Sequence, residues 1–160
     1  MERSRTRGIR ARDRRDRAGR RGTLALSRFC LDTSAYSRFM RGEPEIVQLL
    51  DRADWLGMPS IVLGELQSGF LAGRHTKRNE EALDQFLRHP AVEELSVDRA
   101  VAGIYAEIVG SLRKRGTPIP TNDIWIGATA VRAGATLLTY DAHFVSIERI
   151  GLMLLEPAGR

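Results

Sequence analysis

Short apolar segments alternate with amphipathic helical segments along most of the chain. The apolar segments predict buried strands at residues 27–32, 55–60, 91–97, 135–140 and 151–157. The amphipathic segments predict helices at residues 33–42, 43–53, 61–73, 76–89, 99–116 and 122–134. This alternation is typical of a parallel sheet with helices on both faces. We therefore predict an α/β fold, a three-layer α/β/α sandwich with a short parallel sheet.

Capping residues mark where the predicted helices begin and end. Small polar side chains that can accept hydrogen bonds from a first helical turn are expected to act as N-caps. These residues are Thr33 or Ser34, Ser60, Asp98 and Thr121. Gly42, Gly73 and Gly134 are expected to end the helices that precede them, because glycine adopts the left-handed conformation readily.

Positive charge is concentrated at the start of the chain, where residues 1–28 hold 11 Arg and three acidic residues. Residues 1–26 contain too little apolar surface to offset the entropy of ordering, and we expect them to be disordered. Three interpretations stay open for this extension: an RNA-binding arm, a targeting segment, or upstream sequence from a start codon placed too early. We expect residues 27–158 to form one folded domain.

Cysteine content and hydropathy exclude several classes of protein. The single cysteine, Cys30, excludes an internal disulfide framework and a cysteine-based zinc site. No apolar run approaches the roughly 18 residues that a membrane helix needs. We therefore expect no membrane association and a cytoplasmic location.

Four carboxylates occupy notable positions in this pattern. Asp32 and Asp141 each follow a predicted buried strand, and Asp123 lies in the first turn of a helix. Glu65 lies on a helix face that is otherwise apolar or small, where a carboxylate is unusual. The carboxyl ends of parallel strands form the edge where α/β sheets bind ligands. We therefore expect these four side chains to meet at one site.

Each carboxylate also has an ordinary explanation. The three aspartates can act as helix caps or turn residues, and Glu65 can extend into solvent. Taken together these explanations weaken, because clustered carboxylates raise one another's pKa values and need a counter-ion. A divalent cation such as Mg²⁺ or Mn²⁺ fits oxygen ligands, and its usual partner in catalysis is phosphate.

Three segments resemble the PIN-domain family, and most closely the VapC-like toxins of bacterial type II toxin–antitoxin systems. They are "LDTSAYSRF", "SIVLGELQSGF" and "IPTNDIWIGATAVRAGATLLTYDAHF", within residues 28–156. The resemblance implies a PIN-like nuclease domain and a Mg²⁺- or Mn²⁺-dependent endoribonuclease that hydrolyses RNA. It also implies a cognate antitoxin and a homodimer. The arginine-rich extension departs from the family pattern.

The resemblance also implies roles for individual residues. Asp32, Glu65, Asp123 and Asp141 match the family's acidic quartet, and Asp32, Asp123 and Asp141 are expected to hold the metal. Supporting polar residues are expected at Thr33, Asn122 and Thr139. Basic residues near the site are candidates for RNA contacts, namely Arg38, Arg41, Arg113, Lys114 and Arg115. We expect His143, next to the last acid, to pack or cap rather than to catalyse.

Two other functions were weighed against the nuclease. A phosphatase-like enzyme would need a lysine after a strand, and neither Lys77 nor Lys114 follows one. A non-catalytic RNA- or protein-binding module on the same fold stays the alternative. Four acids facing phosphate argue against an RNA-binding role alone.

Overall fold

A computed structural model describes residues 26–157 and contains a five-stranded sheet in which every pair of neighbours is parallel. The strands are β1 (Arg28–Leu31), β2 (Trp55–Pro59), β3 (Val92–Leu95), β4 (Thr136–Thr139) and β5 (Gly151–Leu154), in the spatial order β3-β2-β1-β4-β5. The predicted parallel α/β sheet is confirmed. The arginine-rich extension, residues 1–26, lies almost entirely outside the described residues.

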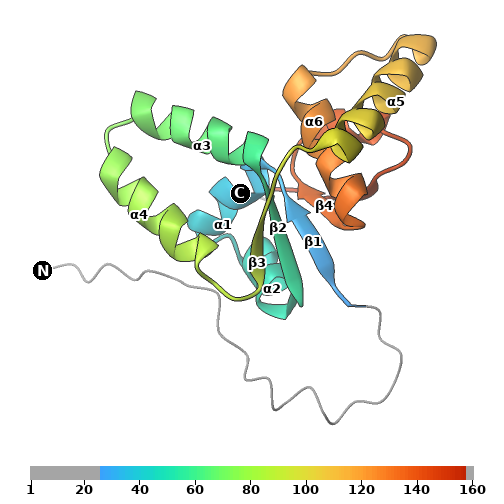
Figure 1. Ribbon diagram of the computed structural model, residues 1–160. Coiled ribbons are helices and arrows are strands. Elements are labelled where there is room, and N and C mark those ends of the chain that lie inside the picture. Colours follow the sequence, from blue (N-terminus) through green and yellow to red (C-terminus); the bar gives the residue numbers. More distant parts are fainter. Residues whose placement is uncertain (1–25, 158–160) are drawn as a thin grey trace, which may run out of the picture.

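Six α-helices and one 3-10 helix connect these strands in the described part of the chain (Figure 1). They are α1 (Thr33–Met40), α2 (Pro44–Arg52), α3 (Ser60–Ala72), α4 (Thr76–Leu87), α5 (Arg99–Arg115), α6 (Thr121–Ala133) and η2 (Ala142–Ser146). Strands β1 to β3 progress across the sheet in one direction, whereas β4 and β5 lie on the other side of β1. Right-handed crossovers therefore place α1–α4 on one face and α5 and α6 on the other, which completes the predicted three layers. None of the helices in residues 26–157 is long and apolar enough to cross a membrane.

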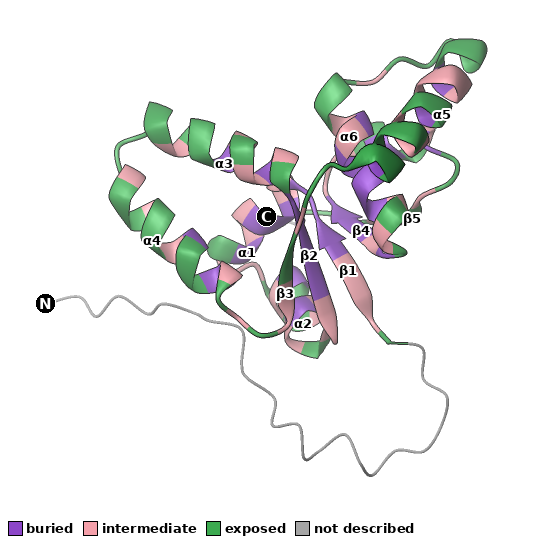
Figure 2. Cartoon of the chain, viewed as in Figure 1, coloured by how far each residue is buried: buried purple, intermediate pink, exposed green. Residues whose placement is uncertain are grey.

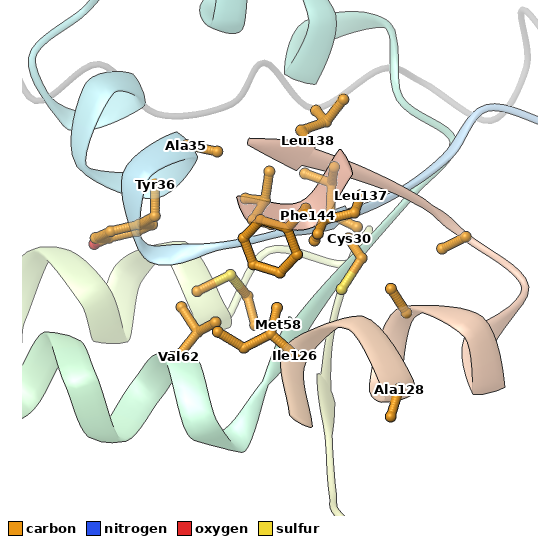
Figure 3. Close-up of a cluster of buried hydrophobic side chains, with 14 of the residues drawn as sticks. Cys30, Ala35, Tyr36, Met58, Val62, Ile126, Ala128, Leu137, Leu138 and Phe144 are labelled. Carbon is orange, nitrogen blue, oxygen red and sulfur yellow. The ribbon is translucent and has the colours of Figure 1, made fainter. Parts of the chain in front are cut away.

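Apolar side chains from the strands and from the facing sides of the helices form the core. Figure 2 shows β2 and β4 as largely buried, whereas the outer sides of the helices are exposed. The central strand β1 pairs on both sides, with β2 and with β4, so its residues Cys30 and Leu31 are completely buried. Figure 3 shows part of this core, in which Met58, Val62 and Phe144 pack with strand residues.

Several predicted helix boundaries are correct and others are wrong. Asp98 caps α5, with its Oδ1 accepting from the Val101 amide at 2.8 Å, as predicted. Gly134 ends α6 in the left-handed conformation, with φ of 61°. Thr33 and Ser34 do not cap α1, because Thr33 is already the first helical residue and Asp32 is the N-cap.

Prolines explain the other two incorrect caps. Pro59 and Pro120 are the N-cap residues of α3 and α6, so Ser60 and Thr121 are already the first helical residues. Neither helix has a side-chain hydrogen bond at its N-cap. Both prolines have an extended ψ and a φ near the value that their rings fix, so each helix starts directly after the ring.

The strand order determines where a site can form. Connections leave β1 and β4 in opposite directions, although these two strands are neighbours. The crevice at the carboxyl ends of such a strand pair is the usual ligand site of a parallel sheet. Asp32 follows β1 directly, and Asp141 lies two residues after the end of β4.

Candidate active site

Asp32 is the most buried carboxylate of the site, with 4% of its surface exposed. Its Oδ1 accepts a hydrogen bond of 2.8 Å from the Ala35 amide, the capping bond of α1. Its Oδ2 accepts one of 2.5 Å from the Thr139 hydroxyl at the end of β4. The Ser34 hydroxyl lies 2.7 and 2.9 Å from the two oxygens. These donors fix the carboxylate between the neighbouring strands β1 and β4.

Burial raises the pKa of Asp32 above the ordinary value for aspartate. The three hydrogen-bond donors oppose this shift, and the charge of Asp141 adds to it. The remaining upward shift means that the folded protein loses stability when this group ionises. Perturbed pKa values of this kind cluster at functional sites.

Glu65 reaches the site from α3 and joins two other helices. Its Oε2 accepts a hydrogen bond from the Thr33 hydroxyl of α1. Its Oε1 accepts one of 2.9 Å from the Asn122 side-chain amide of α6. Two of the expected supporting residues, Thr33 and Asn122, thus contact the same carboxylate. The side chain is neither deeply buried nor free in solvent, as the apolar face of α3 indicated.

Asp123 and Asp141 meet at the junction of α6 and η2. The Asp141 amide donates to the Thr139 hydroxyl at 2.9 Å, so Thr139 contacts both Asp32 and Asp141. Asp141 also caps η2, because its Oδ1 accepts from the His143 amide at 2.9 Å. The His143 Nδ1 lies 3.1 Å from Asp141 Oδ1 and 3.2 Å from Asp123 Oδ2.

The surroundings of Asp123 raise its pKa. Burial is the largest cause, and the negative charges of Asp141 and Glu65 add to it. His143 acts in the opposite direction. The Oδ2 atom of Asp123 is buried and makes no hydrogen bond of good geometry. A buried carboxylate oxygen without a donor is costly unless a cation neutralises it.

The residues present fit a divalent metal ion. One ligand atom each from Asp123, Asp141 and His143 lie within 4.8 Å of one another. Carboxylate oxygens suit Mg²⁺ and Mn²⁺, and the buried Oδ2 of Asp123 makes no hydrogen bond of good geometry, with His143 Nδ1 3.2 Å away. Asp32 and Glu65 interact electrostatically with this group through Asp141 and Asp123 respectively. The structure therefore brings all four sequence-predicted carboxylates together, and their roles stay predictions.

His143 meets the expectation from the sequence in part. Its backbone takes part in a cap, as expected, but its imidazole faces two carboxylates instead of packing. The available signal was its position two residues after an aspartate at a strand end.

The candidate RNA contacts differ in their surroundings. Arg38 donates to both oxygens of Glu43, at 2.8 and 3.1 Å, and its guanidinium lies 4.3 Å from the centre of the Tyr140 ring. Arg115 lies 3.4 Å from Glu148 and donates to the Ser146 carbonyl. The other three, Arg41, Arg113 and Lys114, are exposed.

Comparison with known proteins places this site in a family. A family model described as the PIN domain matches residues 29–150, which include all four carboxylates. The chain belongs to the PIN-domain family. Ribonuclease VapC4 of Mycobacterium tuberculosis is 30% identical to this PIN domain over 102 residues, 64% of this chain and 78% of that protein. Ribonuclease VapC2 of Rickettsia felis is 30% identical over 110 residues, 69% and 79% of the two chains.

A solved structure supports the same assignment. It is the structure of VapBC2 from Rickettsia felis, bound to a DNA fragment from the VapBC2 promoter. The match has a TM-score of 0.69 and 26% identity, and covers 79% of this chain and 97% of that one. The parallel sheet and its helices are thus the PIN-domain fold, as the sequence motifs indicated.

Proposed function

We propose that this PIN domain is a metal-dependent endoribonuclease that acts as the toxin of a type II toxin–antitoxin pair. The observation that carries the proposal is the cluster of Asp123, Asp141 and His143, in which the buried Oδ2 of Asp123 makes no hydrogen bond of good geometry and lies 3.2 Å from His143 Nδ1. An acidic group of this kind, within one site with Asp32 and Glu65, suits a divalent cation and a phosphodiester. The similarity to proteins named ribonucleases supports RNA as the substrate.

We propose a separate role for each side chain of the site, either binding the metal or holding a metal ligand in place. Asp123 and Asp141 would hold a Mg²⁺ or Mn²⁺ ion, and Asp32 would complete the site, directly or through water. The bound ion supplies Lewis-acid polarisation of the phosphate and lowers the pKa of a bound water. Thr139 and Ser34 hold Asp32 in place, because their hydroxyls contact its carboxylate oxygens.

Glu65 is the candidate for orienting the attacking water. Thr33 and Asn122 each occupy one of its oxygens, so the carboxylate is fixed while further lone pairs stay available. In the proposed reaction the water oxygen bonds to phosphorus and the 3′ oxygen leaves with a proton. The products are a 5′-phosphate and a 3′-hydroxyl.

A cleavage assay tests the proposal. Purified protein is incubated with a mixed pool of structured and single-stranded RNA, with Mg²⁺, with Mn²⁺ or with EDTA, beside an Asp123→Asn variant. We expect cleavage that requires the metal and is lost in the variant. Equal cleavage by the variant would place the activity elsewhere. Metal binding by folded protein without cleavage of any RNA would favour the non-catalytic binding module.

The proposed partner is a cognate antitoxin that covers the acidic site. Relatives of this chain occur in VapBC structures, which supports such a partner. Leu71 at the end of α3 is 74% exposed, and Met40 at the end of α1 is also exposed. These apolar side chains offer a surface for a partner helix. We expect co-expression with the cognate antitoxin to yield a stable complex that lacks ribonuclease activity. We also propose that the toxin forms a homodimer.

A further inference from the structure

We propose that the His143 imidazole binds the catalytic metal through Nδ1, together with Asp123 and Asp141, and so makes the site prefer Mn²⁺ to Mg²⁺. The inference rests on the proposed function, because it deepens the account of the same metal site. His143 is not one of the four carboxylates of the acidic quartet.

The distances from His143 Nδ1 to the two carboxylates suit a shared cation. His143 Nδ1 lies 3.1 Å from Asp141 Oδ1 and 3.2 Å from Asp123 Oδ2. Two ligands at right angles around a cation, with bonds of about 2.1 Å, are about 3.0 Å apart. Both measured separations are close to that value, and one ligand atom from each of the three residues lies within 4.8 Å of the others, so the three side chains are close enough to share one cation.

The imidazole of His143 points towards the two carboxylates. The Asp141 carboxylate accepts from the His143 amide at 2.9 Å, which fixes the backbone at the start of η2. The His143 side chain is 54% exposed, so core packing does not determine where the ring points. The two carboxylates are the groups that hold Nδ1 in its position.

The Nδ1 atom of His143 has too few hydrogens for the two carboxylates beside it. A single Nδ1 carries at most one hydrogen and cannot donate well to two carboxylates at once. The Oδ2 of Asp123 accordingly makes no hydrogen bond of good geometry, although it is buried. A cation between the three atoms would give every one of them a partner.

An imidazole nitrogen is a different kind of metal ligand from a carboxylate oxygen. Mn²⁺ accepts oxygen ligands as Mg²⁺ does, but as a first-row transition metal it also accepts imidazole nitrogen, whereas Mg²⁺ is bound mainly through carboxylates, carbonyls and water. A site with one imidazole beside two carboxylates should therefore favour Mn²⁺ over Mg²⁺ more than an all-oxygen site does. Replacing the nitrogen with an oxygen of similar position should reduce this preference.

A competing arrangement makes the opposite prediction. His143 can instead occupy the site as an imidazolium cation that neutralises Asp123 and Asp141 and must leave when metal binds. In that case the removal of His143 would free the carboxylates, and the affinity for both metals would rise. The sign of the change in metal affinity thus separates the two arrangements.

The experiment measures metal binding by the full-length chain without RNA. Calorimetric titrations with Mn²⁺ and with Mg²⁺ compare the wild type with His143→Ala and His143→Asn. Asp123→Asn reports loss of the site, and His75→Ala is the matched control, because His75 is an exposed histidine before α4. Thermal melting verifies that each variant is folded.

We expect His143→Ala to weaken Mn²⁺ binding by about tenfold or more, since even a group that only orients a metal ligand is worth that much. The loss of Mg²⁺ affinity should be smaller. In His143→Asn an amide oxygen can approach the position of Nδ1, so this variant should recover Mg²⁺ binding but not the preference for Mn²⁺. His75→Ala should match the wild type.

A spectroscopic measurement reads the ligand directly. Electron spin-echo modulation from a coordinated nitrogen should be present in the Mn²⁺-loaded wild type and absent in His143→Ala. Unchanged or tighter Mn²⁺ binding by His143→Ala would overturn the inference while leaving the proposed function intact, provided that Asp123→Asn abolishes binding. A wild type that binds neither metal would overturn both.

Discussion

The Thr139 hydroxyl donates a hydrogen bond of 2.5 Å to Oδ2 of Asp32, across 107 positions of the sequence. Thr139 is completely buried and ends β4, whereas Asp32 follows the neighbouring strand β1. The same hydroxyl oxygen accepts from the Asp141 amide at 2.9 Å. One threonine side chain therefore fixes the positions of two carboxylates of the site relative to each other.

Thr139→Val should destabilise the protein and inactivate it. Valine keeps the volume and β-branching of threonine but leaves Asp32 Oδ2 and the Asp141 amide short of a partner. Loss of a buried hydrogen bond to a charged group costs about 2 kcal/mol of unfolding free energy. Urea denaturation measures this loss. Thr129→Val is the matched control, because its buried hydroxyl bonds only to the Trp125 carbonyl of the same helix. A Thr139→Val protein with wild-type activity would contradict the positioning role.

Asp32→Asn should raise stability at neutral pH relative to the wild type while removing activity. The pKa of Asp32 is higher in the folded protein than the ordinary value, so the folded state holds its proton more tightly. The stability that this group contributes is complete below the unfolded pKa, about 4, and is lost as the pH rises through the folded pKa. The advantage of Asp32→Asn should therefore grow from acidic to neutral pH. Urea denaturation at several pH values, without metal, measures it. An advantage that shrinks over this range would contradict the direction of the shift.

Divalent metal should stabilise the folded protein, and EDTA should reverse the effect. Binding to the native state alone adds about 2.7 kcal/mol when free metal is 100 times Kd. Thermal melting with Mn²⁺ measures the shift. Asp123→Asn should show almost none, because it lacks the buried carboxylate oxygen at the centre of the site. An equal shift in the variant would mean that the metal binds elsewhere.

Arg38 and Glu43 should affect RNA binding in opposite directions. The two side chains form a pair at 2.8 Å, and both are partly exposed. Arg38→Ala should weaken RNA binding and lower its dependence on salt, since one phosphate contact is lost. Glu43→Gln should strengthen binding, because Arg38 loses a competing carboxylate. Fluorescence anisotropy with labelled RNA at several salt concentrations measures both. Arg132, an exposed residue in the last turn of α6, is the control. An Arg132→Ala effect as large as that of Arg38→Ala would mean that the effect is a non-specific one of charge.

Gly127→Ala should destabilise the protein through contact with Ile147. A Cβ at position 127 would lie 2.6 Å from Ile147 Cδ1, and Ile147 is buried. Although Cδ1 is the end of the Ile147 side chain, this side chain is buried and has little room to move, so we expect an overpacking cost of about 1–3 kcal/mol to exceed the gain of about 1 kcal/mol from replacing a helical glycine. Ile147→Val removes the clashing methyl group, so the double variant should be more stable than Gly127→Ala alone. Urea denaturation of the four proteins measures the coupling, and strictly additive effects would contradict it.

Much of the fold was predictable because its signals are local. The apolar segment of β4 lies between Gly134 and Asp141. Gly134 ends α6 and Asp141 begins the turn after the strand, as the pattern indicated. The convergence of Asp32 and Asp141 followed from strand polarity alone, because both lie at carboxyl ends of parallel strands. These inferences need only hydrophobic periodicity and turn residues.

Contacts between distant side chains were less predictable. The pairing of Glu65 with Thr33 and Asn122 depends on the angles between three helices, which no local pattern encodes. The orientation of His143 depends on the 3-10 turn after Asp141, which the sequence alone did not reveal. Asp32 acts as the N-cap of α1, a role that its position before the helix allowed, and it also lies at the strand edge where the site forms.

Single-turnover RNA cleavage by carboxamide variants tests the central claim most directly. Asp32→Asn, Glu65→Gln, Asp123→Asn and Asp141→Asn are compared singly and in pairs at saturating metal, after melting confirms that each is folded. If the four carboxylates form one catalytic unit, each single variant should lose about 10²-fold or more in rate, and the pairs should lose little further, because the effects of groups that act together are not additive. A single variant with the wild-type rate, or losses that multiply in the pairs, would contradict a unified metal-dependent nuclease site.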